Sequence, residues 1–231
     1  MRPPPRPVTP PPPMSTVTAI DYPVSLRLEG RRVLLVGGGP VAEGRALALL
    51  DAGARLHLIA PTLTDTLQRL ASEGRLEWEP RTYRTGDTRG HALVLAATDD
   101  AEVNHQLVAE ARAAGQWVNT ADEPELCDFT LPSVERRGPI TLAISTGGHA
   151  PALARHLRRE LGAHIASHHV WLARLSGWLR RHLPRGPRRQ HLLKRLVDGE
   201  LGALRARGER GAVFTRLRSE LKTWKSSGEP T

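Results

Sequence analysis

The chain has 231 residues, of which 39% are hydrophobic and 4% aromatic, so it can build one large hydrophobic core or two small ones. Its single cysteine, Cys127, excludes a disulfide scaffold and a zinc or iron–sulfur site that needs several cysteines. No apolar run approaches the roughly 20 residues of a membrane span, and the N-terminus lacks the apolar stretch of a secretory signal. We therefore expect a cytoplasmic protein with no membrane partner.

The net charge of +9 comes entirely from the C-terminal third of the chain. Residues 1–150 carry 15 basic and 18 acidic residues, whereas 151–231 carry 18 basic and 6 acidic residues. Such an asymmetry is typical of chains that bind nucleic acid or another polyanion. A coding bias towards arginine, which outnumbers lysine 30 to 3, is the alternative explanation, but it does not account for the missing acidic residues.

Strands and helices are predicted to alternate from Tyr22 onward, after a lead-in whose first 13 residues include eight prolines. The predicted strands cover 32–36, 56–59, 76–78, 93–97 and 117–119, and the predicted helices cover 41–50, 63–71 and 101–114. This order indicates right-handed crossovers and a parallel sheet, which is the α/β fold class of Rossmann-type domains.

The pattern changes near residue 129, where two strands are predicted over 129–133 and 139–145, around a turn at 136–138. Only helices are predicted after Pro151. Apolar stripes mark their faces, and two further helices fit 192–204 and 213–224. The stripes consist of Leu153, Leu157 and Leu161, and then of Ile165, His168, Trp171, Leu172, Leu175, Trp178 and Leu179. The tryptophans in these stripes are expected to belong to the core.

A glycine-rich turn joins the first predicted strand to the first predicted helix, with the sequence Gly37-Gly38-Gly39-Pro40-Val41-Ala42. The turn fits the dinucleotide motif G-x-G-x-x-A, in which glycines let the backbone approach a pyrophosphate at a helix N-terminus. A tight turn without a ligand is the alternative. The second strand is followed by Ala60-Pro61-Thr62, which has neither the acid typical of NAD nor an arginine for NADP, so this position does not decide between them.

Polar residues follow the fourth and fifth predicted strands, at the edge where parallel sheets bind ligands. Thr98 is a candidate nicotinamide contact, and Thr98 or Asp99 is equally a candidate N-cap of the next helix. Asp122 follows the fifth strand and begins an acidic cluster, which is either a solvated loop or part of the crevice. Residues 145–149 precede the helix at Pro151 and predict an N-cap more strongly than an anion site.

Five segments in this order resemble the precorrin-2 dehydrogenase family, which includes the dehydrogenase and ferrochelatase half of siroheme synthase. The resemblance covers roughly residues 22–165, and the helical remainder resembles the family's C-terminal domain. The segments are Val36–Ala42, Ala96–Asp100 with Asn104, Val118–Asp122, Cys127–Phe129 with Pro132, and Ile144–Gly148 with Pro151–Arg155. The family usually has Arg-Lys where this chain has Gly44-Arg45, and His149 occupies a variable position.

The resemblance implies an enzyme that oxidises precorrin-2 to sirohydrochlorin with NAD, and ferrous iron insertion in some members. Asp122 matches the catalytic aspartate. Pro40-Val41 and Pro61-Thr62 match dinucleotide contacts, beside Gly37, Gly38, Gly39 and Thr98. Thr146 matches a hydroxyl residue of the tetrapyrrole site. Gly147, Gly148 and Arg155 are further candidates for this site, because they follow Thr146 at the start of the next predicted helix. We expect no resident metal. The chain lacks the methyltransferase domain of longer siroheme synthases, so we do not expect it to make precorrin-2.

The domains expected on this basis are a disordered lead-in at 1–21, an NAD-binding Rossmann domain at 22–131, a dimerisation segment of a homodimer at 132–165 and a basic helical domain at 166–226. One carboxylate at the crevice can accept the proton that leaves during dehydrogenation, and arginine forks suit a ring with several carboxylates. Two alternatives stay open: a redox-sensing regulator with a nucleic-acid-binding tail, and a regulator that binds NAD without catalysis. We expect no nucleic acid partner, because the tail lacks interleaved exposed aromatics.

Overall fold

The computed structural model describes residues 21–226, which form two compact units that meet between Thr130 and Leu131. The proline-rich lead-in expected at 1–21 lies outside the described residues, except for its last residue. Each unit is described by itself. The other expected domain boundaries stay predictions.

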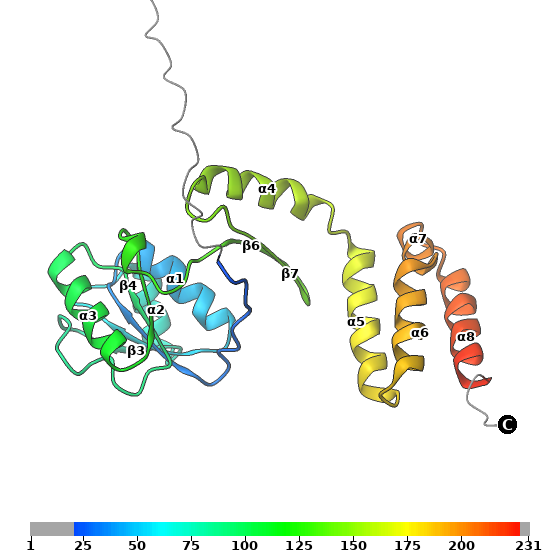
Figure 1. Ribbon diagram of the computed structural model, residues 1–231, viewed down its shortest axis with the longest axis horizontal. Helices are drawn as coiled ribbons and strands as arrows, with labels where there is room; N and C mark the ends of the chain where they lie inside the picture. Colours follow the sequence, from blue (N-terminus) through cyan, green and yellow to red (C-terminus); the bar gives the residue numbers. More distant parts are fainter. Residues whose placement is uncertain (1–20, 227–231) are drawn as a thin grey trace, which may run out of the picture. The chain divides into compact units, whose positions relative to one another are not determined.

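The first unit is a five-stranded parallel sheet in the order β3-β2-β1-β4-β5. Its strands are β1 (Arg32–Val36), β2 (Arg55–Ile59), β3 (Glu77–Glu79), β4 (Leu93–Ala96) and β5 (Trp117–Thr120), and its helices are α1 (Pro40–Asp51), α2 (Asp65–Ser72), α3 (Ala101–Ala113) and the short η1 (Pro124–Leu126). The strand order reverses between β1 and β4, which is the place where doubly wound sheets bind ligands. The predicted Rossmann-type fold class is thus confirmed (Figure 1).

The strand β1 is buried on both sides, as its continuous apolar run predicts. Val33 and Leu35 face a core shared with α1 and α2, whereas Leu34 and Val36 face a second core shared with α3. This double burial fixes the position of β1, and with it the position of the glycine-rich turn that follows.

The connection between β3 and β4 has no regular structure, and one of the carboxylates that hold it comes from α3. Glu110 of α3 accepts hydrogen bonds from Tyr83 Oη at 2.5 Å, Gly86 N at 2.9 Å and Thr88 Oγ1 at 2.6 Å. Burial by itself would raise the pKa of Glu110, but the bonds donated by Thr88, Tyr83 and Gly86 outweigh it and lower the pKa. The ionised form of Glu110 therefore stabilises this connection.

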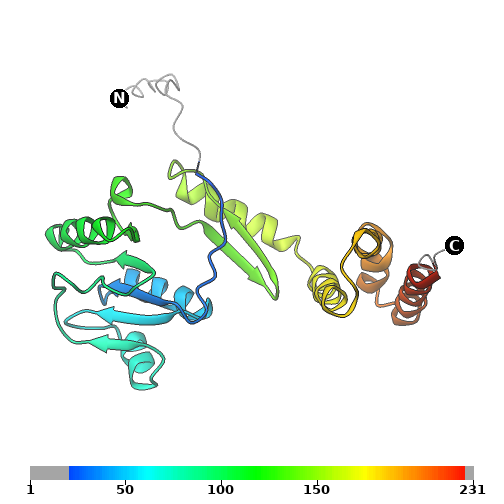
Figure 2. The same cartoon turned by 60° about the horizontal axis from the view of Figure 1, so that its bottom comes forward.

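The second unit begins with an antiparallel hairpin and continues as helices. Figure 2 shows the hairpin beside α4. Its elements are β6 (Ser133–Arg137), β7 (Ile140–Ile144), α4 (Pro151–Ala163), α5 (Ser167–His182), α6 (Pro187–Asp198), α7 (Leu201–Ala206) and α8 (Arg210–Ser226). Leucines of α5, α6 and α7 form its buried core, of which Leu179, Leu192 and Leu196 are almost completely buried. The expected helical C-terminal part is present.

The strand predicted over 129–133 was wrong. Phe129 packs against the core of the first unit, and its carbonyl accepts a hydrogen bond from Asn119 Nδ2 at 2.8 Å, so this segment does not join the hairpin. The hairpin turns instead at Gly138, whose φ of +58° favours glycine, and Arg137 lies in a strand rather than in the turn. The helix predicted over 192–204 is two helices, because Gly199 is extended and interrupts it.

The apolar face predicted for α4 is not the buried one. Ala154 and Gly162 are buried against the hairpin, whereas Leu153 and Leu161 are 49% and 46% exposed. A Cβ on Gly162 would lie 3.0 Å from the Glu135 side chain, which would have to shift by a few tenths of an ångström to make room. The leucine face of α4 is therefore left uncovered among residues 21–226.

The expectation that the tryptophans belong to the core fails for one of them. Trp178 is 49% exposed and stacks on His182, with ring centroids 4.3 Å apart. Trp171 and Trp224 do pack against the leucine core of the second unit.

Candidate active site

The glycine-rich turn is shaped by close contacts on both of its sides. Gly37 has a φ of +123°, and a Cβ on it would lie 2.1 Å from the carbonyl oxygen of Ala97. A Cβ on Gly38 would lie 1.9 Å from the carbonyl oxygen of Thr62, and the Gly38 carbonyl accepts a hydrogen bond from Thr64 N at 3.0 Å. These two glycines are therefore required by the fold itself.

Gly39 differs from its two neighbours because the fold does not require it. Its φ is −83°, and a Cβ on it would meet no atom within 4 Å. It is the N-cap of α1, makes no side-chain cap and precedes Pro40 and the exposed Val41. Because Gly39 has no side chain, an anion can approach the first turn of α1. The pyrophosphate of a dinucleotide is an anion of this kind.

The predicted dinucleotide contacts come together around this turn. Gly38 touches the segment that contains Pro61 and Thr62, and Gly37 touches the segment that leads into Thr98. A hydrogen bond of 2.5 Å from Thr64 Oγ1 to Glu43 Oε2 joins the starts of α1 and α2. No motif in the sequence predicted this link.

The N-cap of α3 is Asp100, so neither candidate from the sequence was right. The Asp100 carboxylate accepts hydrogen bonds from Glu102 N at 3.0 Å and Val103 N at 3.1 Å. The Thr98 hydroxyl accepts one from Asp100 N at 2.8 Å, so it shapes the loop at the end of β4. A role of Thr98 towards a nicotinamide stays a prediction.

Asp122 lies two residues beyond the end of β5, and its side chain is exposed. Within the described residues its carboxylate accepts no hydrogen bond and forms no ion pair. Two members of the same acidic cluster are engaged, because Asp128 accepts a hydrogen bond from Val118 N at 3.0 Å and Glu123 pairs with His105 at 2.9 Å. Asp122 is therefore available for a proton, unlike these neighbours.

Arg45 was not among the residues selected from the sequence, although it lies at the same edge of the sheet. Its guanidinium donates to the carbonyl oxygens of Ala96 at 2.8 Å and of Thr120 at 3.1 Å. Burial lowers the pKa of Arg45, and the nearby Cys127 and Asp122 oppose this shift. Its only signal in the sequence was that Gly44-Arg45 stand where the family usually has Arg-Lys.

The predicted tetrapyrrole residues belong to the second unit. The Thr146 hydroxyl accepts a hydrogen bond from Ala150 N at 3.1 Å, and the N-cap Ala150 makes no side-chain cap, so the cap predicted for α4 was wrong. Gly147 and Gly148 have φ values of +57° and +79°. Arg155 is exposed on the first turns of α4 and has no acidic partner among residues 21–226.

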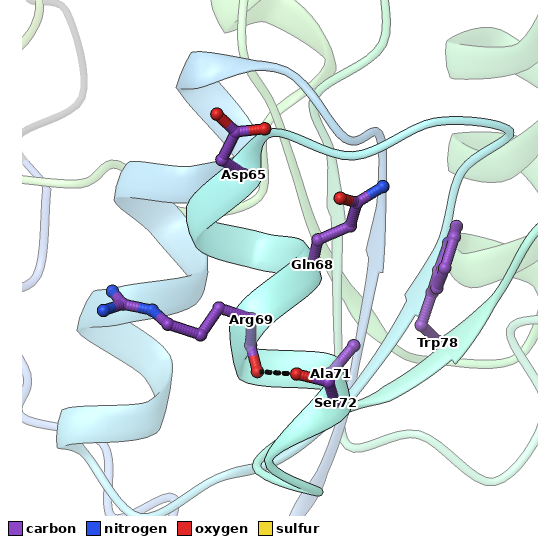
Figure 3. A pocket seen from close by; sticks show the side chains of 6 residues that line it. All are labelled: Asp65, Gln68, Arg69, Ala71, Ser72 and Trp78. Atoms are coloured by element: carbon purple, nitrogen blue, oxygen red, sulfur yellow. Dashed lines mark hydrogen bonds between the residues drawn. The ribbon is translucent and has the colours of Figure 1, made fainter.

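A separate hollow of about 690 Å³ lies between α2 and the edge strand β3 (Figure 3). Its lining consists of Asp65, Gln68, Arg69, Ala71, Ser72 and Trp78. The indole of Trp78 is held by a 3.0 Å hydrogen bond to the carbonyl of Ala60. None of the residues predicted to bind a ligand lines this hollow.

Residues 21–226 contain no gathering of three or more His, Cys, Asp or Glu side chains that could hold a metal ion. Within the same range no helix has the length and apolar character needed to cross a bilayer. The candidate site of the first unit thus consists of the glycine-rich turn, the ends of β4 and β5, and the carboxylate of Asp122.

Comparisons with known proteins agree with this description. Residues 24–133 match a family described as "Putative NAD(P)-binding", and residues 137–164 match the family of the sirohaem biosynthesis protein central segment. Siroheme synthase 1 of Aeromonas salmonicida is 41% identical over 200 residues, which are 84% of this chain and 43% of that protein. The siroheme synthase of Photorhabdus laumondii is 37% identical over 215 residues, or 91% of this chain and 46% of that protein.

A solved structure, of SirC, precorrin-2 dehydrogenase, matches with a TM-score of 0.72 and 25% identity. The match covers 89% of this chain and all of that one. The chain spans less than half of the length of the siroheme synthases that it matches.

The fold and the glycine-rich turn define a Rossmann-type NAD(P)-binding protein. Over the parts that match, the chain is similar to siroheme synthases and to a precorrin-2 dehydrogenase, the proteins of the family that its sequence resembles. This confirms the resemblance derived from the sequence, and the family matches support the expected NAD cofactor.

Proposed function

We propose that the protein is an enzyme that oxidises precorrin-2 to sirohydrochlorin with NAD, in the formation of siroheme. The observation that carries the proposal is the open N-terminus of α1 at Gly39, on the same sheet edge as the free carboxylate of Asp122. The likeness to SirC and to siroheme synthases supports the choice of substrate.

In this proposal the turn from Gly37 to Gly39 holds the pyrophosphate, and Val41, Pro61, Thr62 and Thr98 contact the rest of the dinucleotide. NAD, when bound, supplies a hydride acceptor. Precorrin-2 loses a hydride and a proton, so that sirohydrochlorin, NADH and one proton are formed. Asp122 accepts the proton, because its carboxylate has no other partner in the described chain.

The tetrapyrrole site is proposed to include Thr146, Gly147, Gly148 and Arg155. Precorrin-2 carries several carboxylates, and a guanidinium without an acidic partner is suited to pair with one of them. Arg158, one turn further along α4, is a poorer candidate, because it pairs with Glu135 at 3.5 Å.

The proposal includes a homodimer in which the second copy covers the leucine face of α4. Leu153 and Leu161 are half exposed there, and apolar residues that repeat along one helix face are suited to pack against another chain. A cytoplasmic location is proposed as well, because the reaction consumes NAD. Analytical ultracentrifugation that finds only monomers at micromolar concentration would refute the dimer.

Insertion of ferrous iron into sirohydrochlorin, a lyase reaction, is proposed as a second activity of the same site. The pyrrole nitrogens must lose protons when iron enters, and Asp122 is suited to accept them. The alternative of a nucleic-acid-binding redox sensor is not favoured, since the related proteins are siroheme synthases and a precorrin-2 dehydrogenase.

The proposal is tested by incubating the purified protein with precorrin-2 and either NAD or NADP, with and without ferrous iron. We expect sirohydrochlorin to form with NAD, and siroheme to follow when iron is present. If NAD is bound but precorrin-2 stays unchanged, the protein is a non-catalytic NAD-binding regulator and the proposed dehydrogenation is wrong.

A further inference from the structure

The side chain of Arg45 is hydrogen-bonded to both residues of the last β4–β5 pair. Ala96 and Thr120 are partners in this parallel pair, and each is the last residue of its strand. The two carbonyls accept from the Nη1 and Nη2 atoms of the same guanidinium, at 2.8 Å and 3.1 Å. One side chain therefore fixes both strand ends at the point where they leave the sheet.

The loops that leave the sheet at this point carry the two polar candidates of the site. Thr98 lies two residues after Ala96, and Asp122 lies two residues after Thr120. Arg45 itself belongs to α1, which begins directly after the glycine-rich turn. Arg45 thus links the helix of the dinucleotide site to both loops, so a displacement of its guanidinium would move all three relative to one another.

The charge of Arg45 is costly in this place. Removing a guanidinium from water is unfavourable unless it is hydrogen-bonded, and an apolar side chain would fill the same space without that cost. Burial lowers the pKa of Arg45, yet an arginine side chain stays charged at physiological pH. Its two carbonyl partners satisfy part of its donors, and the nearby Cys127 and Asp122 favour its charged form.

We propose that Arg45 is a positioning residue for the dehydrogenation, an inference that rests on the proposed function. It fixes the loops of Thr98 and Asp122 relative to the glycine-rich turn. This role needs the fork of the guanidinium, because only a two-pronged donor reaches both carbonyl oxygens.

Two variants of Arg45 test whether the fork of the guanidinium is needed. Arg45→Met removes the fork and the charge, whereas Arg45→Lys keeps the charge but offers a single ammonium in place of a planar fork. Arg69→Met is the matched control, because Arg69 is an exposed arginine of α2 in the same unit and binds neither strand end.

The first readout is hydrogen exchange of the NAD-free protein, followed by mass spectrometry. We expect faster exchange in peptides that cover 96–99 and 120–123 in both Arg45 variants, and unchanged exchange in the control. This readout does not depend on the activity, so it tests the positioning even if precorrin-2 is not the substrate.

The second readout is the split between kcat and KM with precorrin-2 and NAD. In Arg45→Met we expect kcat of the folded protein to fall about 10- to 100-fold while KM for precorrin-2 changes little, because the displaced loop carries the proposed proton acceptor and none of the proposed tetrapyrrole residues. In Arg45→Lys we expect kcat to fall less. A structural role alone would lower the stability of the protein and leave kcat of the folded protein unchanged.

The outcomes distinguish the two proposals. An inactive wild-type protein would refute the proposed function. An active wild-type protein whose Arg45 variants keep the exchange rates, or whose folded Arg45→Met variant keeps the wild-type kcat, would overturn the role of Arg45. If Arg45→Met does not fold, as judged by circular dichroism, the comparison of Arg45→Lys with the control decides: unchanged exchange overturns the positioning.

Discussion

Replacing Gly39 by aspartate should stabilise the protein and weaken NAD binding at the same time. Gly39 is the N-cap of α1, has a φ of −83° and has no atom within 4 Å of its Cβ position, so the new side chain fits without strain. Aspartate at an N-cap accepts hydrogen bonds from the first turn, and its charge interacts favourably with the helix dipole. Together these effects are worth up to about 1 kcal/mol, which raises Tm by roughly 1–5 °C.

The same carboxylate would occupy the place of the pyrophosphate. Two like charges about 4 Å apart repel by roughly 1 kcal/mol in bulk water and by roughly 4 kcal/mol near a protein surface. We therefore expect the affinity for NAD, measured by calorimetry, to fall roughly 5- to 1,000-fold, since about 1.4 kcal/mol corresponds to a factor of ten. Gly44→Asp is the matched control: it adds the same charge to α1 outside the turn, where a Cβ also meets no atom within 4 Å.

Unchanged NAD affinity in folded Gly39→Asp protein would refute the assignment of this turn to the dinucleotide. A large loss of stability would refute the description of Gly39 as free. Gly37→Ala shows the contrast, since its φ of +123° and its contact with Ala97 predict a loss of several kcal/mol, seen as a lower midpoint of urea unfolding.

Four further predictions concern other parts of the molecule. Asp122→Asn should lower kcat roughly 10²- to 10⁴-fold with little change in substrate binding, whereas near-normal turnover would remove Asp122 from the mechanism. Arg155→Gln should raise KM for precorrin-2 and flatten its salt dependence without changing NAD affinity, since one screened ionic contact is lost. The folded-state pKa of Glu110 lies below its ordinary value of 4.5, so its stabilisation is present above about pH 4.5 and is lost as the pH falls through the folded-state pKa. Glu110→Gln should therefore reduce the loss of stability measured by urea unfolding in this range. Leu192→Ala, in the core of the second unit, should lower the free energy of unfolding by about 2–5 kcal/mol.

The parts of the fold that local chemistry determines were predictable from the sequence. The apolar run of β1 is buried on both faces, and the three glycines after it form the expected turn. The alternation of strands and helices was enough to predict the parallel sheet, because each element buries a face that its own sequence defines. The start of the hairpin was not predictable from the sequence. Phe129 could pack on either unit, and only its tertiary contacts show that it belongs to the first one.

The limits of sequence reasoning in the site have the same cause. Leu153 and Leu161 have the period of a buried helix face, but α4 presents the smaller Ala154 and Gly162 to the hairpin. Apolar periodicity therefore indicates which face of a helix tends to be buried, but it does not indicate which element or chain packs against that face. In the sequence, Arg45 stands out only as a departure from the family pattern. Its partners are backbone carbonyls 51 and 75 residues away, and a backbone carbonyl is present whatever the residue type, so the sequence cannot identify them.

The most direct test of the account is the stoichiometry of the reaction under anaerobic conditions. Precorrin-2 is supplied in limiting amount with excess NAD, and sirohydrochlorin and NADH are measured together in the wild-type protein and in Asp122→Asn. The account predicts one NADH for each sirohydrochlorin in the wild-type protein, and the same ratio at a much lower rate in the variant. Sirohydrochlorin formed without NADH, or no sirohydrochlorin from wild-type protein that binds NAD, would contradict it.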